Sequence, residues 1–490
     1  MSHNPQHKKA LSALDITLYT ISAILLVDQI ALSAAVGASA IFWWLVVLVL
    51  FFIPNTLVTA ELGTRYPEQG GIYAWIRDAF GTRWGARITW LYWINIALWM
   101  PAVFIMFGAI FSALYWPQLS LWGQIGIGLA LCWLTAAINC LPLRLSKWIP
   151  NLGTPLKFLV ILTLGIGGLW YGLQHGFAND LSLAHSLERL DEGLAYIPVI
   201  VYGCLGVELI SAESGAIRNP HRNIPRAMLV AGLLTAACYI FGTLGVLAAV
   251  PAERIDTVDI IAVSLRELFA SAAFGETLAL SVGGAALLTF FSTMVTWTLG
   301  GNCAMAEAGA AREMPAAFAK KHPQHGAPVG AALLTSALSS SILLLYGIMA
   351  GTAEELFWNL FSFSAIIFLM PYVGMHLAYL KLRRRDAPRA GCFRVPGTWL
   401  HRVLACNCIL ILGMAIALFF WVPGEPLDWY ILGQVGTGVL ATLLLGEYLV
   451  RLGEKARKAS ETADPSRVGA GGTMGCTQGA LPGAESRRMP

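Results

Sequence analysis

The sequence predicts an all-α membrane protein with twelve transmembrane helices. Of the 490 residues, 57% are hydrophobic and only 12% are charged, whereas soluble domains carry about 25% charged residues. Twelve apolar runs are long enough to cross a hydrocarbon core of roughly 30 Å. The first and the sixth run are each interrupted, which is typical of a five-plus-five inverted repeat with helices 1 and 6 broken. Two C-terminal helices complete the expected fold.

The charges between the runs support this number of spans. Of the 32 Lys and Arg residues, 28 fall in the N-terminus, the even-numbered loops or the C-terminal tail. Arg189, Arg254 and Arg266 are in odd-numbered loops, and Lys157 lies inside the fifth run. By the positive-inside rule both termini are then cytoplasmic. A missed helix would disturb the alternation. The runs lie near 14–36, 41–63, 88–114, 121–141, 152–173, 194–216, 227–250, 277–302, 328–350, 355–380, 402–421 and 428–450.

The expected segments are an N-terminus at 1–10, a first repeat at 11–173, a second repeat at 194–380, a helix pair at 400–451 and a tail at 452–490. The tail is polar, rich in Gly and Ala and without period, so we expect it to be disordered. Met1–Ala10 is polar and basic and leads directly into a span, which argues against a cleavable signal. The sequence has no nucleotide-binding, metal-spaced or nucleophile motif, so we expect neither a cofactor, a metal site, a nucleic-acid partner nor an enzyme.

The sixth run carries the main candidate site. Gly203 and Gly206 stand shortly before the acid Glu208. Each glycine costs a helix roughly 1 kcal/mol relative to alanine, and an acid at the middle of a membrane costs roughly 2.5–3.5 kcal/mol. Irregular backbone at that depth is tolerated where it lines a cavity, which favours a discontinuous helix. The alternative is a kinked structural helix in which Glu208 reaches the interface.

The first run has a weak stretch of small residues at Ser22-Ala23 and an acid at Asp28. A break here would place the site between helices 1 and 6. Asp28 is either functional or a polar residue that faces a neighbouring helix. Lys157, inside the fifth run, either snorkels to the cytoplasmic surface or pairs with a buried group.

Aromatic residues occur in and beside several runs, and their positions suggest where they lie relative to the membrane interface. We assign Trp90, Tyr92 and Trp93 to an interfacial belt rather than a ligand cage. After the second run, Pro67 and Gly70-Gly71 force a turn, and an amphipathic interfacial helix follows, with Trp75 and Arg77 at headgroup depth. In the eighth run Trp297 lies deep for a belt residue, among hydroxyl side chains that by default bond to other helices.

Three strings in this chain resemble motifs of the amino acid–polyamine–organocation transporter superfamily, over about residues 11–450. The first interruption reads Ser22-Ala23-Ile24, where the arginine/agmatine exchangers of the superfamily have Gly-Ser-Gly, and a cytoplasmic tail follows the last span. The chain is therefore most similar to the bacterial glutamate/γ-aminobutyrate antiporter branch. The strings are Glu61-Leu62-Gly63 with Tyr66-Pro67 and Gly70–Trp75, then Gly206-Val207-Glu208 with Arg218-Asn219-Pro220 and Ile224–Ala227, and finally Phe393–Gly397.

The resemblance implies a LeuT-type fold, in which broken helices 1 and 6 hold the carboxylate and the amine of the substrate through backbone groups. It also implies that Lys157 takes the place of a sodium ion and that Tyr202 is a gating aromatic. Trp297 and Ser364 fall where relatives have pocket residues. The substrate-binding residues expected on these grounds are Ser22, Ala23, Ile24, Leu25, Tyr202, Leu205, Gly206, Trp297 and Ser364, with Glu208 and Lys157 as coupling residues.

One departure concerns the end of the eighth run. Many relatives have an Arg there, before an acidic loop, whereas this chain has Cys303 and then Arg312-Glu313-Met314-Pro315. Closure on the cytoplasmic side would then use other partners.

The expected function is secondary active transport of an amino acid across a bacterial plasma membrane. The first hypothesis is an amino acid/amine antiporter that works by alternating access without sodium. The alternatives are a proton-coupled amino acid or polyamine symporter or uniporter, and a transporter-like sensor that does not transport. Apart from the small-molecule substrate, the expected partner is the lipid bilayer.

Overall fold

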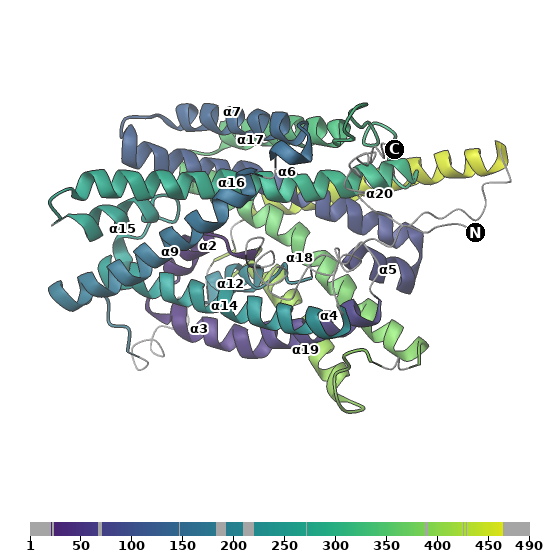
Figure 1. Ribbon diagram of the computed structural model, residues 1–490, viewed down its shortest axis with the longest axis horizontal. Coiled ribbons are helices and arrows are strands. Elements are labelled where there is room, and N and C mark those ends of the chain that lie inside the picture. Colours follow the sequence, from purple (N-terminus) through teal and green to yellow (C-terminus); the bar gives the residue numbers. More distant parts are fainter. Residues whose placement is uncertain are drawn as a thin grey trace, which may run out of the picture.

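The computed structural model describes residues 21, 24–66, 71–146, 148–182, 193–208, 220–270, 272–387, 391–424, 426–427 and 429–463. Within this part of the chain every regular element is a helix (Figure 1). Ten helices are long and apolar enough to cross a membrane. They correspond to ten of the twelve expected runs, and in the other two, the first and the sixth, the described residues form only short helices. Nearly all the buried apolar side chains belong to one continuous core.

The helices of the first half of the chain are α2 (Asp28–Ala34), η1 (Gly37–Ser39), α3 (Ala40–Val47), η2 (Leu48–Phe52), α4 (Ile53–Arg65), α5 (Ile72–Phe80), α6 (Thr82–Tyr115), α7 (Leu121–Asn139), α8 (Leu143–Ser146) and α9 (Trp148–His175). Those of the second half are η3 (Leu194–Tyr196), α12 (Ile197–Gly203), α14 (Pro220–Ala249), η5 (Ala252–Arg254), α15 (Ile260–Phe269), α16 (Gly275–Ala310), α17 (Val329–Met349), α18 (Ala353–Arg385), α19 (Leu400–Leu418) and α20 (Trp429–Ala463). The long helices lie side by side in Figure 1, with the short α2 and α12 among them.

The described residues of the first and the sixth run each include a non-helical stretch. In the first run the backbone is irregular at Leu25–Val27, and α2 begins only at Asp28. In the sixth run α12 ends at Gly203 and the next five residues, up to Glu208, are not helical. Gly206 has a φ of 104°, a conformation that a side chain with a Cβ disfavours. The glycine therefore permits the turn that the sequence indicated.

The second run is helical from α3 to α4, joined by the single π-helical turn η2. The expected helix after it is α5, which follows Gly71 with a φ of 51°. The assignment of Trp75 to headgroup depth is wrong, because its side chain is fully buried and its indole N–H donates to the carbonyl of Tyr66 at 3.2 Å. The ring anchors α5 to the protein rather than to the interface.

The tail is more ordered than expected at its start. α20 continues to Ala463, although the sequence predicts disorder from residue 452. The segment consists mainly of strong helix formers, and Glu454 lies 3.5 Å from Lys458 one turn later, a pairing that supports an exposed helix. Residues 464–490 lie outside the described part of the chain.

α9 and α14 pack with almost no side chain between them. A Cβ on Gly168 would overlap the carbonyl oxygen of Gly245, and a Cβ on Gly245 would overlap that of Leu164. Small residues let membrane helices approach closely, so that van der Waals contact stabilises the pair. This contact fixes α9, which carries Lys157, against a helix that also packs on α2.

We expect Gly245→Ala to lower the thermal unfolding temperature of the purified protein in detergent, because the added methyl group overpacks the α9–α14 contact by roughly 1–3 kcal/mol. Gly126→Ala in α7 is the matched control, since nothing lies within 4 Å of a Cβ built at that position. The control should unfold at or slightly above the temperature of the parent. Equal unfolding temperatures for the two variants would contradict the close packing.

Candidate functional site

The break in the first span is held by one tyrosine. Tyr239 on α14 is fully buried, and its hydroxyl donates to the carbonyl oxygen of Ile24 at 2.6 Å. The Tyr239 hydroxyl oxygen in turn accepts the backbone N–H of Leu26 at 2.9 Å. These are backbone groups that lose helical partners at the break, and buried polar groups without partners are costly. Tyr239 thus stabilises the irregular backbone from outside the helix.

The break in the sixth span is held by its own acid. The Glu208 carboxylate is 2% exposed, and its Oε2 accepts the backbone N–H of Gly206 at 3.1 Å. Its Oε1 accepts the hydroxyls of Tyr92 at 2.7 Å and Tyr372 at 2.6 Å. All three of these groups donate, and both oxygens of the carboxylate accept. Glu208 therefore joins the sixth span to α6 and α18.

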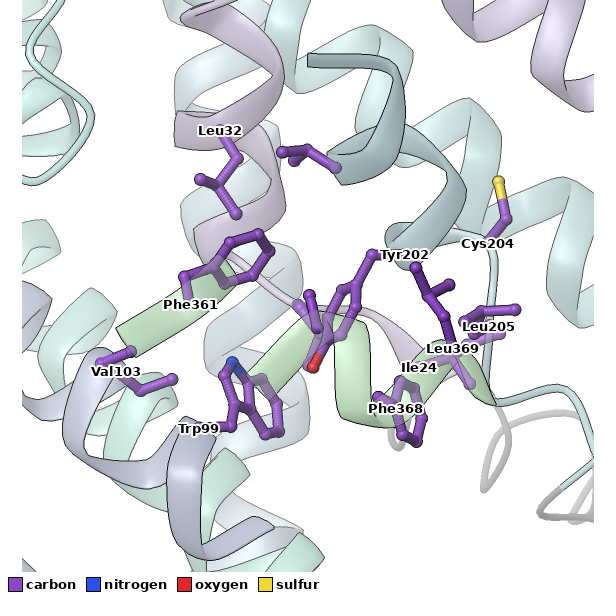
Figure 2. Packing of buried hydrophobic residues seen from close by; sticks show 14 of the residues in the cluster. Ile24, Leu32, Trp99, Val103, Tyr202, Cys204, Leu205, Phe361, Phe368 and Leu369 are labelled. Carbon is purple, nitrogen blue, oxygen red and sulfur yellow. The ribbon is translucent and has the colours of Figure 1, made fainter. Parts of the chain in front are cut away.

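Five aromatic side chains from four helices, which we name the aromatic cluster, lie between the two breaks. Tyr202 lies at the centre, with its ring centroid 5.2 Å from that of Phe361 and 5.3 Å from that of Phe368. Most of the contacts are edge-to-face, a favoured aromatic geometry. Figure 2 shows Tyr202, Trp99 and Phe368 close together, with Ile24 and Leu205 nearby. The members are Trp99 on α6, Tyr202 on α12, Trp297 on α16, and Phe361 and Phe368 on α18.

Phe368 also links the aromatic cluster to Glu208. Its ring centroid lies 5.5 Å from that of Tyr92 and 5.3 Å from that of Tyr372, the two tyrosines that donate to the carboxylate. A rearrangement of Tyr202 or Trp297 would therefore press on the ring that contacts both tyrosines.

The remaining expected substrate-binding residues have varied surroundings. Ile24, Leu25 and Leu205 are buried at the breaks. The Ser364 hydroxyl donates to the carbonyl of Phe361 at 2.9 Å, which leaves its oxygen free to accept from a ligand. Ser22 and Ala23 lie outside the described residues.

Lys157 on α9 is only 3% exposed, so its side chain does not extend to the surface as the snorkelling alternative requires. It interacts electrostatically with Asp28, which is also buried and begins α2. Opposite charges that leave water together keep more of their attraction than an exposed pair does. The structure thus connects the fifth span to the interrupted first span through charge.

The interfacial belt assigned to α6 is wrong for two of its three members. Trp90 and Trp93 are both 3% exposed, and their indole N–H groups donate to the carbonyl of Thr442 at 3.0 Å and to Oδ1 of Asn302 at 3.1 Å. The third, Tyr92, points to Glu208. These rings therefore face other helices, because α6 runs through the middle of the protein, where indole donors find protein partners.

A network of buried polar groups connects two motif segments that are distant in sequence. Glu61 on α4 pairs with Arg383 on α18, and the same carboxylate oxygen accepts from Tyr379 at 2.9 Å and from the backbone N–H of Val395 at 2.8 Å. The arginine also donates to the carbonyl of Val395 at 2.9 Å. This network holds the end of α18 on α4.

A second contact involves the loop that departs from the pattern of relatives. The hydroxyl of Tyr73 on α5 lies 2.9 Å from both carboxylate oxygens of Glu313. The hydroxyl supplies a partner for Glu313 in the loop that follows α16, the helix that carries Cys303 in place of the arginine of relatives.

The side chains around the breaks leave little empty space. A cavity beside the breaks, lined by Ile24, Gly203, Cys204 and Tyr239 among others, has a volume of about 10 Å³, which is room for about one water molecule at most. A Cβ on Gly203 would meet the side-chain oxygen of Gln29 at 2.5 Å. Aromatic side chains or the interrupted helices must move before a substrate can enter.

Several residues of this site were missed by the sequence analysis. The roles of Tyr239, Tyr372, Phe361 and Phe368 carry no local signal, because each reads as an ordinary apolar position of a helix. Trp99 has no local signal that distinguishes it from the other aromatic residues of its span. Its indole nitrogen is buried and has no hydrogen-bond partner within the described residues.

Known proteins resemble the chain over most of its length. The profile of the amino acid permease family matches residues 11–439. A probable agmatine/putrescine antiporter of Lactococcus lactis is 30% identical over 91% of this chain and 95% of its own length. A serine/threonine exchanger of Bacillus subtilis is 27% identical, over 86% of this chain and 90% of its own. An uncharacterized transporter of Legionella pneumophila is also 27% identical, over 86% and 91%.

The interrupted helices and the ten apolar spans agree with these matches. The chain belongs to the amino acid permease family of the amino acid–polyamine–organocation superfamily, and it is a multi-pass membrane transporter rather than an enzyme.

Proposed function

We propose that this protein exchanges an amino acid for an amine across a bacterial plasma membrane, by alternating access and without sodium. The observation that carries the proposal is the meeting of two interrupted helices, one buried carboxylate and the aromatic cluster in one closed site. The relatives named as an antiporter of amines and as an exchanger of amino acids support exchange. Both termini would be cytoplasmic, with twelve spans in two inverted sets of five plus two. Within the superfamily, the glutamate/γ-aminobutyrate branch stays a prediction.

The substrate would bind at the breaks through its carboxylate and its ammonium group. The backbone at Ile24–Leu25, where the first irregular stretch begins, and at Leu205–Gly206 would bind the carboxylate and the ammonium. The faces of aromatic rings attract cations, so the aromatic cluster suits an ammonium group at the other end of the substrate. The buried N–H of Trp99 and the free lone pair of Ser364 would orient that end.

Glu208 would couple protonation to the opening of the site. Its carboxylate now accepts from Tyr92, Tyr372 and Gly206. A proton on one oxygen would replace an acceptor with a donor and break at least one of these bonds. Because the bonds tie the sixth span to α6 and α18, protonation would release the sixth span and favour the open state.

Counterflow in proteoliposomes separates the three functional hypotheses. We expect labelled amino acid to enter only when an unlabelled amino acid or amine is present inside, and at equal rates in sodium and in potassium buffer. A panel of amino acids and their decarboxylation products identifies the pair. Uptake into empty vesicles would indicate a symporter or uniporter instead. A complete lack of transport across the panel would indicate a sensor.

Lys157→Ala should reduce exchange at least tenfold in protein that is still folded and inserted. The change removes a charge that balances Asp28 and, by this proposal, replaces sodium at the first break. Leaving a buried charge without its partner costs several kcal/mol, so stability must be measured alongside transport.

The double variant Lys157→Ala with Asp28→Asn separates a loss of stability from a loss of transport, because it removes both charges of the buried pair. It should recover part of the unfolding temperature while exchange stays low. Lys320→Ala, at an exposed position, is the charge control and should transport normally. Near-normal exchange by Lys157→Ala, or an absolute need for sodium in the parent, would refute the role of Lys157.

Glu208→Gln should keep substrate binding while the dependence of exchange on pH becomes flat. The amide resembles the protonated carboxyl at every pH, because one of its ends can only donate. Rates are measured by counterflow between about pH 5 and pH 8, and binding by substrate-induced thermal stabilisation. Glu276→Gln at an exposed position of α16 is the matched control. An unaltered pH profile in Glu208→Gln would leave this residue a structural acceptor only.

A further inference from the structure

A groove far from the transport site opens on the surface between α5 and the last two turns of α18. Its volume is about 600 Å³, within the range of ligand pockets in proteins. The two helices lie at the same end of the molecule in Figure 1. The groove is lined by three apolar and three basic residues, Phe80, Leu377, Leu380, Lys381, Arg384 and Arg385.

The lining is ordered along α18. Leu377, which is 46% exposed, is followed one turn later by Lys381, and Leu380 is followed one turn later by Arg384. One turn of helix rises about 5.4 Å. Because α18 is a membrane span that ends at Arg385, each apolar residue lies on the membrane side of a cation.

Two of the three cations have no acidic partner among the described residues. Arg385 donates to Oδ1 of Asp386 at 2.8 Å and to the carbonyl of Asp78 at 2.7 Å. Hydrogen bonds from Arg385 and Tyr66 lower the pKa of Asp386 to about 2, so its carboxylate is ionised at neutral pH and balances Arg385. Among the described residues no carboxylate forms an ion pair with Lys381 or Arg384, both of which are exposed.

Lys381 is held in place by an aromatic ring. Its Nζ lies 4.8 Å from the centroid of Phe80, the last residue of α5. A cation over a ring face is attracted by the ring, and the contact leaves the other side of the ammonium open. The groove therefore carries two uncompensated positive charges above an apolar wall.

We propose that this groove binds one anionic phospholipid of the inner leaflet, with its phosphate at Lys381 and Arg384 and an acyl chain along Leu377 and Leu380. The order of apolar and basic residues matches the order of chain and headgroup in a phospholipid. Basic pockets between helices on the cytoplasmic side favour such lipids. A soluble anion would use the cations and leave the apolar wall exposed.

Occupancy would stabilise the contact between α5 and α18. Arg385 already joins them through the carbonyl of Asp78, and the neighbouring Arg383 carries the Glu61 network. A lipid bound across both helices would reinforce these contacts without touching the transport site.

The test measures lipid-dependent stability of the full chain in detergent. Phosphatidylglycerol is the probe, phosphatidylcholine and glycerol phosphate are the comparisons, and the unfolding temperature is read from tryptophan fluorescence. We expect phosphatidylglycerol to raise this temperature well above the effect of either comparison. In Lys381→Gln with Arg384→Gln its apparent affinity should fall roughly 20- to 30-fold, about fivefold for each charge removed.

Lys320→Gln with Arg402→Gln removes two exposed charges from other elements and is the matched control, which should respond like the parent. Native mass spectrometry counts bound lipid independently of unfolding, and the two single variants serve if the double variant does not fold. Equal affinity in the groove variant and the parent would overturn the proposal. An equal response to phosphatidylcholine, or to glycerol phosphate alone, would also overturn it.

Discussion

The backbone of a membrane span must satisfy its polar groups within the protein, because hydrocarbon offers no hydrogen bonds. This chain breaks two spans near one another and supplies the missing partners from side chains. Tyr239 donates to and accepts from the first break, and Glu208 accepts from Gly206 at the second. Both side chains are buried. Tyr239 belongs to α14, and Glu208 is held by Tyr92 on α6 and Tyr372 on α18, so the irregular backbone depends on the packing of these three helices.

α18 connects the site to the end of the protein where α5 lies. Phe361 and Phe368 belong to the aromatic cluster, Tyr372 donates to Glu208, and Tyr379 and Arg383 contact Glu61. Successive positions in this series are separated by seven or four residues, so they lie along one side of the helix. A movement of α18 would therefore change the site and the Glu61 network together.

The Glu61 network explains why two of the motif strings occur in one chain. Glu61 and Val395 are 334 positions apart, and neither string has an evident use alone. In the folded protein the carboxylate accepts the N–H of Val395 while Arg383 binds both segments. A buried ion pair is retained at a desolvation cost unless further hydrogen bonds complete it, and here Tyr379 and Val395 supply those bonds.

The sequence by itself determined the class of the protein, the position of the apolar runs and both interruptions, since span length, charge alternation and the pair Gly203 and Gly206 act over short distances along the chain. It did not determine which aromatics face the site. Trp75, Trp90 and Trp93 fit a membrane interface by position, yet they are buried, and Phe368 and Tyr239 look like any apolar residue of a span. The tertiary structure decided these roles because membrane helices are apolar on every side, so sequence periodicity cannot distinguish a face in lipid from a face in the core.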